Sequence, residues 1–325
     1  MILVSAPLRV SFFGGGSDLE SYYKNHGGAF LSLTLNSRIF LAVNLTTNNE
    51  VKVHYSKTEI VESSSMLEHS LIREALNLFK IDNNIEIGSF ADMPTSGTGL
   101  GSSSSFSVAL IGALKKIKGI PFSSRDLAEE ACHLEIDICG ENIGKQDQYA
   151  AAFGGLNFYE IDKSGLIKVS KNLVTSSIES ELEDRLYLVN TGIKRSASSI
   201  LKKQIDNIET SNQSLESQKN LVEMAYQAYE FLIDGKLDEF GSLLHESWIC
   251  KKSVSNLISD SSLDEIYTNG IKAGALGGKL LGAGGGGFFL FYVPTSNKNL
   301  FESEFSGNFK KISISQEGFM TNYET

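Results

Sequence analysis

The stretch Pro94-Thr-Ser-Gly-Thr-Gly-Leu-Gly-Ser-Ser-Ser-Ser105 leads directly into an apolar segment with helical spacing. Phe106, Leu110 and Leu114 recur on one face of that segment, which predicts a helix that begins at the serines. A helix N-terminus carries unpaired N–H groups and a partial positive charge, and glycines let a ligand approach bare backbone. The stretch therefore predicts a phosphate-binding loop; the alternative interpretation is a Ser/Gly-rich cap without a ligand.

The residues around this loop exclude two common nucleotide motifs. No lysine follows the last glycine, so the loop is not a Walker A motif. It also lies far from the first strand, with no acidic residue at the end of a second strand nearby, which argues against a dinucleotide-binding dehydrogenase. The serines are suited to contact phosphate oxygens or Mg²⁺.

Two further glycine clusters, at residues 14–16 and 282–287, lie between apolar segments. Strand-like alternation dominates the first half of the chain, for example over residues 1–13 and 51–55 and in two runs within 28–46. Helical spacing dominates after the polar stretch 171–184. We therefore expect an α+β protein with two domains, residues 1–175 and 176–325.

Composition narrows the function further. The chain has 325 residues, 41% of them apolar, and a net charge of −10, which argues against a nucleic-acid partner. Three cysteines without a C-x-x-C pair favour neither a disulfide framework nor a zinc site. The N-terminus lacks a basic leader, and no apolar run is long enough to span a membrane. We expect a cytoplasmic protein without a membrane partner.

Three stretches in order resemble the motifs of the GHMP kinases: residues 6–18 (A-P-L-R-V-S-F-F-G-G-G-S-D), the loop at 94–105, and residues 279–291 (K-L-L-G-A-G-G-G-G-F-F-L-F). The resemblance implies an N-terminal α+β domain with a left-handed βαβ unit and a C-terminal ferredoxin-like α+β domain. It also implies that ATP and the acceptor meet in a cleft between the domains.

The first motif resembles a subgroup of that family, the kinases of D-glycero-D-manno-heptose 7-phosphate, and more distantly the fucokinases. Residues 144–155 and 191–198 show the same resemblance. It implies phosphorylation of the anomeric hydroxyl to a 1,7-bisphosphate on the way to a GDP-activated heptose. The alternatives are a kinase for an unphosphorylated sugar and an inactive sensor that binds sugar and ATP. A homodimer is a further expectation.

The resemblance also implies roles for individual residues. Asp147 matches the carboxylate that accepts the acceptor's proton, and Arg9 matches the basic residue of the first motif that supports the nucleophile and the γ-phosphate. Glu135 and Ser103 match the ligands of Mg²⁺. The expected ATP-binding residues are Gly97, Gly99, Leu100, Gly101, Ser102, Ser103, Ser104, Gly284 and Gly285.

The acceptor site is expected at the first glycine cluster. Asp18 matches the family's acceptor of sugar hydroxyl hydrogen bonds, with Gly15 and Gly16 beside it. Lys194 and Arg195 follow a predicted strand and precede a predicted helix, so this basic pair is our candidate for binding the distal phosphate.

Overall fold

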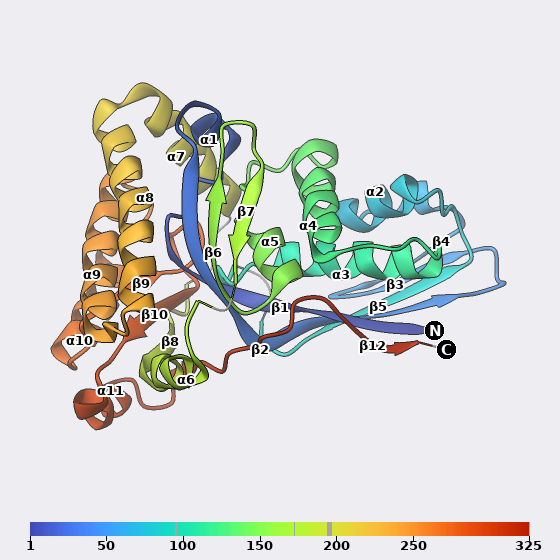
Figure 1. The fold of residues 1–325 in the computed structure, drawn as a ribbon. Coiled ribbons are helices and arrows are strands. Elements are labelled where there is room, and N and C mark those ends of the chain that lie inside the picture. Colours follow the sequence, from blue (N-terminus) through green and yellow to red (C-terminus); the bar gives the residue numbers. More distant parts are fainter. Residues whose placement is uncertain (95–96, 172, 194–196, 325) are drawn as a thin grey trace.

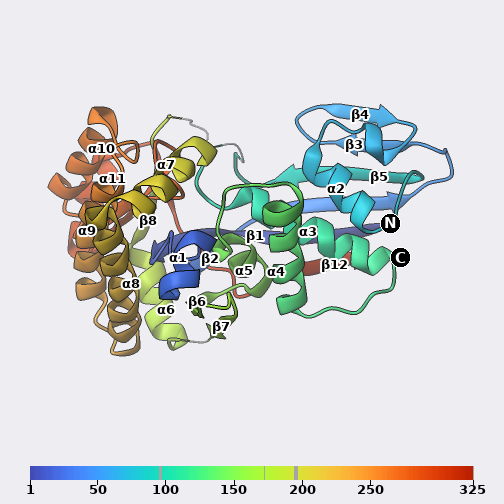
Figure 2. The same ribbon diagram turned by 90° about the horizontal axis from the view of Figure 1, so that it is seen from above.

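The computed structural model describes residues 1–94, 97–171, 173–193 and 197–324 (Figure 1). Two β-sheets form its framework. The larger sheet carries helices on one face, and the smaller sheet is covered by the long helices of the C-terminal half (Figures 1 and 2).

The larger sheet has the strand order β12-β1-β2-β5-β3-β4, with β6 and β7 added beside β2. All neighbouring pairs are antiparallel except β3 and β5, which run parallel. The chain passes between these two strands through β4 and helix α2, as in the βαβ unit that the family resemblance implies. The strands are β1 (Ile2–Phe13), β2 (Gly28–Leu45), β3 (Val51–His54), β4 (Thr58–Val61), β5 (Ile85–Ala91), β6 (Leu156–Ile161), β7 (Ile167–Ser170) and β12 (Met320–Glu324).

Most helices of this half form a layer on one face of the sheet (Figure 1), whereas the short first helix packs beside the helices of the C-terminal half. The central one, α3, packs on β1 and β2 and carries the predicted apolar stripe. The helices are α1 (Glu20–His26), α2 (Ser70–Leu78), α3 (Ser102–Ile117), α4 (Ser124–Cys132) and α5 (Gln146–Phe153), with the 3₁₀ turn η1 (Ser64–Met66) and the π-helical turn η2 (His133–Ile138).

Strand β2 is one continuous strand, although the sequence predicts two separate runs within residues 28–46. The polar residues between the runs do not end the strand because Arg38 finds partners inside the protein. Its guanidinium donates to the Ser5 hydroxyl at 2.9 Å and to the Ser315 hydroxyl at 3.2 Å. Burial lowers the pKa of Arg38 to about 10.

The smaller sheet is antiparallel, with the order β11-β8-β10-β9. In chain order its elements read strand, helices, strand, strand, helix, strand, which is the predicted ferredoxin-like pattern. The strands are β8 (Leu186–Asn190), β9 (Gly277–Leu280), β10 (Phe288–Tyr292) and β11 (Phe309–Lys311). The helices are α6 (Ser176–Arg185), α7 (Ala197–Thr210), α8 (Asn212–Ile233), α9 (Leu237–Val254), α10 (Ser261–Lys272) and α11 (Lys298–Glu304), with the 3₁₀ turn η3 (Thr295–Asn297).

The two halves share apolar packing. One buried cluster joins Leu8 and Phe12 of β1 to Leu188 of β8, Phe240 of α9 and Leu290 of β10. The last strand, β12, returns to pair with β1, so the two chain ends lie side by side (Figure 1). The domain division at residue 175 stays a prediction. No helix within the described parts of the chain is long and apolar enough to cross a membrane.

Candidate active site

A cavity of about 360 Å³ lies where the two halves meet. One wall is formed by Arg9 and the glycine turn at residues 14–16, and another by the glycine loop at residues 97–101 and the start of α3. The N-terminal end of α5 and turn η2 contribute acidic side chains, and α9 and β9 close the remaining side. All three glycine clusters that the sequence singles out therefore meet at one site, the third through Gly282.

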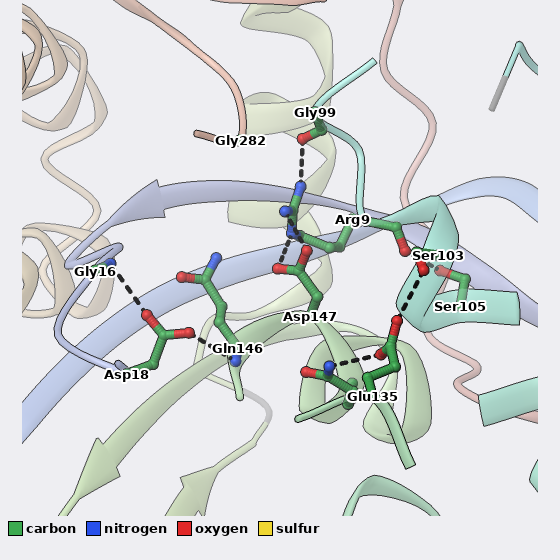
Figure 3. A network of polar contacts seen from close by, with 12 residues as sticks. Arg9, Gly16, Asp18, Gly99, Ser103, Ser105, Glu135, Gln146, Asp147 and Gly282 are labelled. Atoms are coloured by element: carbon green, nitrogen blue, oxygen red, sulfur yellow. Dashed lines mark hydrogen bonds and ion pairs between the residues drawn. The ribbon is translucent and has the colours of Figure 1, made fainter. Parts of the chain in front are cut away.

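Arg9 and Asp147 form an ion pair in the wall of this cavity (Figure 3). The guanidinium donates through Nε to Oδ1 and through Nη2 to Oδ2 of Asp147, both at 2.6 Å. Its third nitrogen, Nη1, donates to the Gly99 carbonyl. Arg9 is buried, whereas the Asp147 side chain is 27% exposed. The carboxylate is thus fixed in orientation and still reachable from the cavity.

Three glycines in the loop before α3 have a left-handed backbone conformation. Gly97, Gly99 and Gly101 have φ values of 69°, 72° and 73°, and Gly101 is the N-cap of α3. A Cβ at Gly101 would lie 3.0 Å from the Arg9 side chain, and one at Gly99 would lie 2.4 Å from the Leu281 carbonyl. These glycines therefore let the loop contact the ion pair and the third glycine cluster. The Thr98 hydroxyl is buried without a hydrogen-bond partner in the described structure.

Glu135 is completely buried beside the first turn of α3. Its carboxylate accepts hydrogen bonds from the Ser103 hydroxyl at 2.8 Å and from the Gln148 amide at 2.6 Å (Figure 3). Burial, with a smaller contribution from the charge of Asp147, raises the pKa of Glu135 to about 7. A carboxylate and a hydroxyl that line the same cavity are hard oxygen donors, which is a set that fits Mg²⁺.

The helix that carries Glu135 differs from the one that the sequence predicts. Helical spacing after Ser123 predicts a buried stripe that includes Leu134 and Ile138, with Glu135 at the edge of the stripe. In the structure Ile138 is exposed and Glu135 is buried. The reason is the π-helical turn, in which the Cys139 N–H donates to the Leu134 carbonyl five residues earlier. This wider turn rotates the following residues relative to an α-helix and directs Glu135 into the site.

Asp18 lies buried in the cavity wall beside the first glycine turn. Its carboxylate accepts from the backbone N–H of Gly16 at 3.0 Å and from that of Gln146 at 2.9 Å (Figure 3). Burial raises the pKa of Asp18, with a smaller contribution from Asp147. Asp18 thereby ties the first glycine turn to the start of α5, one residue before Asp147. Asp18 and Gln146 both line the cavity.

Some residues expected at the site lie elsewhere. Leu100 is in the apolar core and contributes its carbonyl to the Arg9 N–H. Gly284 and Gly285 pack against Ile258, whereas Gly282 and Ala283 line the cavity. The cavity is lined by Gly15, Gly16, Gly97, Gly99, Gly101 and Ser102 to Ser104, and their roles in binding stay predictions. Lys194 and Arg195 lie outside the described residues.

Sequence reasoning missed two lysines in the cavity wall. Lys251 projects from α9, and Lys279 from β9. Lys279 opens the third glycine-rich stretch, and this position in the sequence is a signal that it lies near the glycine clusters of the cavity. Lys251 sits in an ordinary amphipathic helix, and only the fold brings it to the site.

Comparisons with known proteins agree on the family of this chain. Residues 59–155 match the family "GHMP kinases N terminal domain", and residues 228–310 match "GHMP kinases C terminal". The D-glycero-alpha-D-manno-heptose 7-phosphate kinase of Campylobacter jejuni is 30% identical over 334 residues, covering 98% of this chain and 97% of the relative.

A second sequence relative and a solved structure are also similar to this chain. The bifunctional fucokinase/GDP-fucose pyrophosphorylase of Arabidopsis thaliana is 27% identical over 91% of this chain, which spans only 30% of that larger protein. A crystal structure of a D-glycero-D-manno-heptose 1-phosphate kinase from Bacteroides thetaiotaomicron superposes with a TM-score of 0.80 at 24% identity, covering all of both chains. That likeness confirms the predicted fold.

Proposed function

The chain belongs to the GHMP kinase family, and we propose that it transfers the γ-phosphoryl group of ATP to the anomeric hydroxyl of D-glycero-D-manno-heptose 7-phosphate. The expected enzyme class, a sugar kinase, is confirmed by the family and its named relatives. The product would be the 1,7-bisphosphate, a precursor of a GDP-activated heptose. Action in the cytoplasm and assembly as a homodimer remain predictions.

The Arg9–Asp147 pair is the observation that carries the proposal. A sugar hydroxyl that attacks phosphorus must lose its proton, and the Asp147 carboxylate, reachable from the cavity, is placed to accept it. Arg9 holds this carboxylate and also contacts the phosphate loop through Gly99. The pair thus links the proton acceptor to the phosphoryl donor, which argues against an inactive sugar-binding protein.

The nucleotide phosphates would lie along residues 97–104. The first N–H groups of α3 and the serine hydroxyls there line the cavity, and the helix dipole favours an anion at this end. The unpartnered Thr98 hydroxyl adds a donor in the same loop. Glu135 and Ser103 would hold Mg²⁺, which when bound would neutralise charge on the phosphates.

The acceptor would lie over the turn at residues 14–16. Asp18 would accept hydrogen bonds from sugar hydroxyls, with Gly15, Gly16 and Gln146 around it. Lys194 and Arg195 remain our candidates for the distal phosphate. Because the fucokinase relative also matches most of this chain, a kinase for an unphosphorylated sugar is the second candidate function.

A coupled ADP-release assay with ATP and Mg²⁺ discriminates these functions. We expect kcat/KM to be at least about tenfold higher for the heptose 7-phosphate than for unphosphorylated heptose or fucose, since a charge-assisted hydrogen bond contributes roughly 1.5–3 kcal/mol. Heptose 1-phosphate, whose anomeric position is blocked, should not react. A higher kcat/KM for a plain sugar, or turnover of the 1-phosphate, would refute the proposed substrate.

A further inference from the structure

Two lysines of the C-terminal half lie beside Arg9 in the cavity wall. The Lys251 ammonium donates to the Gly282 carbonyl at 2.6 Å and to the Leu280 carbonyl at 3.3 Å. The Lys279 ammonium donates to the Phe12 carbonyl at 2.8 Å. We refer to Arg9, Lys251 and Lys279 as the cation cluster.

The two lysines of the cation cluster are held by uncharged groups. Among the residues that the structure describes, neither forms an ion pair with a carboxylate, and their hydrogen-bond acceptors are neutral carbonyls. Burial lowers the pKa of Lys251 to about 8, with the charge of Arg9 acting in the same direction. Burial also lowers the pKa of Lys279, together with the charges of Lys251 and Arg9. Buried like charges are costly to hold together, so this arrangement is expected to be stabilised by an anion.

The contacts of the cluster place that anion near the reacting atoms. Gly282 touches Gly99 backbone to backbone, and the Gly99 carbonyl accepts a hydrogen bond from Arg9 (Figure 3). Lys251 donates to the Gly282 carbonyl, so Lys251 and Arg9 reach the same junction of two glycine loops. Lys279 is bonded to β1 at Phe12, three residues beyond Arg9 on that strand. The two lysines therefore border both the phosphate loop and Arg9, which is the partner of Asp147.

We propose that Lys251 and Lys279, together with Arg9, bind the phosphoryl group while it passes from ATP to the acceptor. This inference deepens the proposed kinase function. In the transfer, a bond forms between the acceptor oxygen and the γ-phosphorus, the bond to the β–γ bridging oxygen breaks, and ADP keeps that electron pair. The acceptor's proton goes to Asp147, and the cluster stabilises the negative charge on the phosphoryl oxygens.

The distal phosphate of the sugar is the other source of such an anion. The cluster favours the transferred group because one of its members, Arg9, holds the carboxylate that faces the reacting hydroxyl. A phosphate at the opposite end of the sugar would lie away from Asp147. The two sources are distinguished by which ligand loses affinity when a lysine is removed.

The test uses Lys251→Met and Lys279→Met in the full-length enzyme. Lys252→Met is the matched control, because Lys252 is adjacent on α9 but pairs with Asp264 at 3.0 Å and does not line the cavity. Calorimetry compares the affinity for a non-hydrolysable ATP analogue with that for ADP, both with Mg²⁺. We expect each cavity variant to lose at least about tenfold of its preference for the analogue over ADP, and the control to lose none. In a turnover assay, kcat should fall about a hundredfold or more in the cavity variants, with the KM for sugar phosphate within about threefold of wild type.

An unchanged analogue-to-ADP preference in both cavity variants would overturn the inference. So would a rise in the KM for sugar phosphate alone, since that result would assign the cluster to the distal phosphate. Thermal unfolding identifies a variant that does not fold, and in that case Lys279→Arg, which keeps the charge, should retain the preference. The calorimetric comparison of the ATP analogue with ADP does not depend on which sugar is the substrate. A negative result there is therefore distinguishable from a wrong assignment of the sugar.

Discussion

Both carboxylate oxygens of Asp147 accept hydrogen bonds from the guanidinium of Arg9, at 2.6 Å each. Arg9 belongs to the first glycine-rich stretch and Asp147 to the first turn of α5, 138 residues later. This bidentate pair fixes the proposed proton acceptor beside the phosphate loop.

Replacing Asp147 by Asn should keep the fold and nucleotide binding but remove the proton acceptor. The rate of transfer is then expected to fall by ~10²–10⁴-fold. The measurement is kcat, with the ATP affinity from calorimetry alongside. Asp137→Asn, at an exposed residue paired with His133, serves as a control that should be fully active. Turnover at the wild-type rate in Asp147→Asn would assign proton transfer to another group.

Replacing Gly101 by Val should weaken ATP binding far more than sugar binding. Gly101 has a positive φ, and a side chain there would contact Arg9 and Asp147. Gly119, at the other end of α3, also has a positive φ but has open space around its Cβ position. Gly119→Val therefore carries similar backbone strain without the contact. We expect ATP to bind at least about tenfold more weakly to Gly101→Val and with wild-type affinity to Gly119→Val, as measured by calorimetry. Equal ATP affinities in the two variants would show that the loop does not hold the nucleotide.

Removing the Glu135 carboxylate by Glu135→Gln should raise the Mg²⁺ concentration needed for half-maximal activity by about tenfold or more. The reason is that an amide oxygen is a weaker ligand for Mg²⁺ than a carboxylate. The KM for sugar phosphate should stay near its wild-type value. A magnesium titration identical to that of wild type would place the metal elsewhere.

The double change Lys194→Ala with Arg195→Ala should raise the KM for sugar phosphate by ~10-fold or more, with little effect on the KM for ATP. It should also narrow the preference for phosphorylated over unphosphorylated heptose. Competition between the two sugars measures that preference. If the ratio does not change, the distal phosphate binds at other residues or the natural substrate lacks it.

Lys251 should make the stability of the nucleotide-free enzyme depend on pH. Burial lowers its pKa from 10.5 to about 8, so between these values the unfolded chain binds more protons than the folded one. The free energy of unfolding of wild type should therefore rise with pH in this window relative to Lys251→Met, by about 1 kcal/mol per pH unit. Below about pH 8 Lys251 is protonated in both states, and the difference becomes constant. Urea unfolding of both proteins across this pH range gives the two free energies of unfolding. If their difference did not change with pH, the lowered pKa of Lys251 would be contradicted.

The glycine loops and several strands of the larger sheet follow from local sequence patterns, whereas these patterns do not predict β4 and β12. Alternation predicts β1, and the loop at residues 94–105 predicts the start of α3, because both depend on neighbouring residues. The ferredoxin-like order of the smaller sheet came from the family resemblance, since strand order is set by contacts between distant segments.

Other parts of the site depend on contacts that no local pattern carries. Glu135 is buried because a π-helical turn rotates it inward, and helical spacing alone leaves it at the edge of the stripe. The sequence around Lys251 is typical of a surface lysine on a helix. Lys251 reaches Gly282 only because α9 packs beside β9. Its hydrogen-bond acceptors are neutral carbonyls, so we expect a bound anion to compensate the cost of burying its charge.

The central claim is transfer of phosphate to the anomeric oxygen of a heptose that already carries a distal phosphate. ³¹P NMR of a reaction with ATP, Mg²⁺ and D-glycero-D-manno-heptose 7-phosphate tests it most directly. We predict a new anomeric phosphate signal that grows with that of ADP while the distal phosphate signal persists. Release of ADP with inorganic phosphate as its only partner, or an anomeric phosphate formed only from unphosphorylated sugars, would contradict the claim.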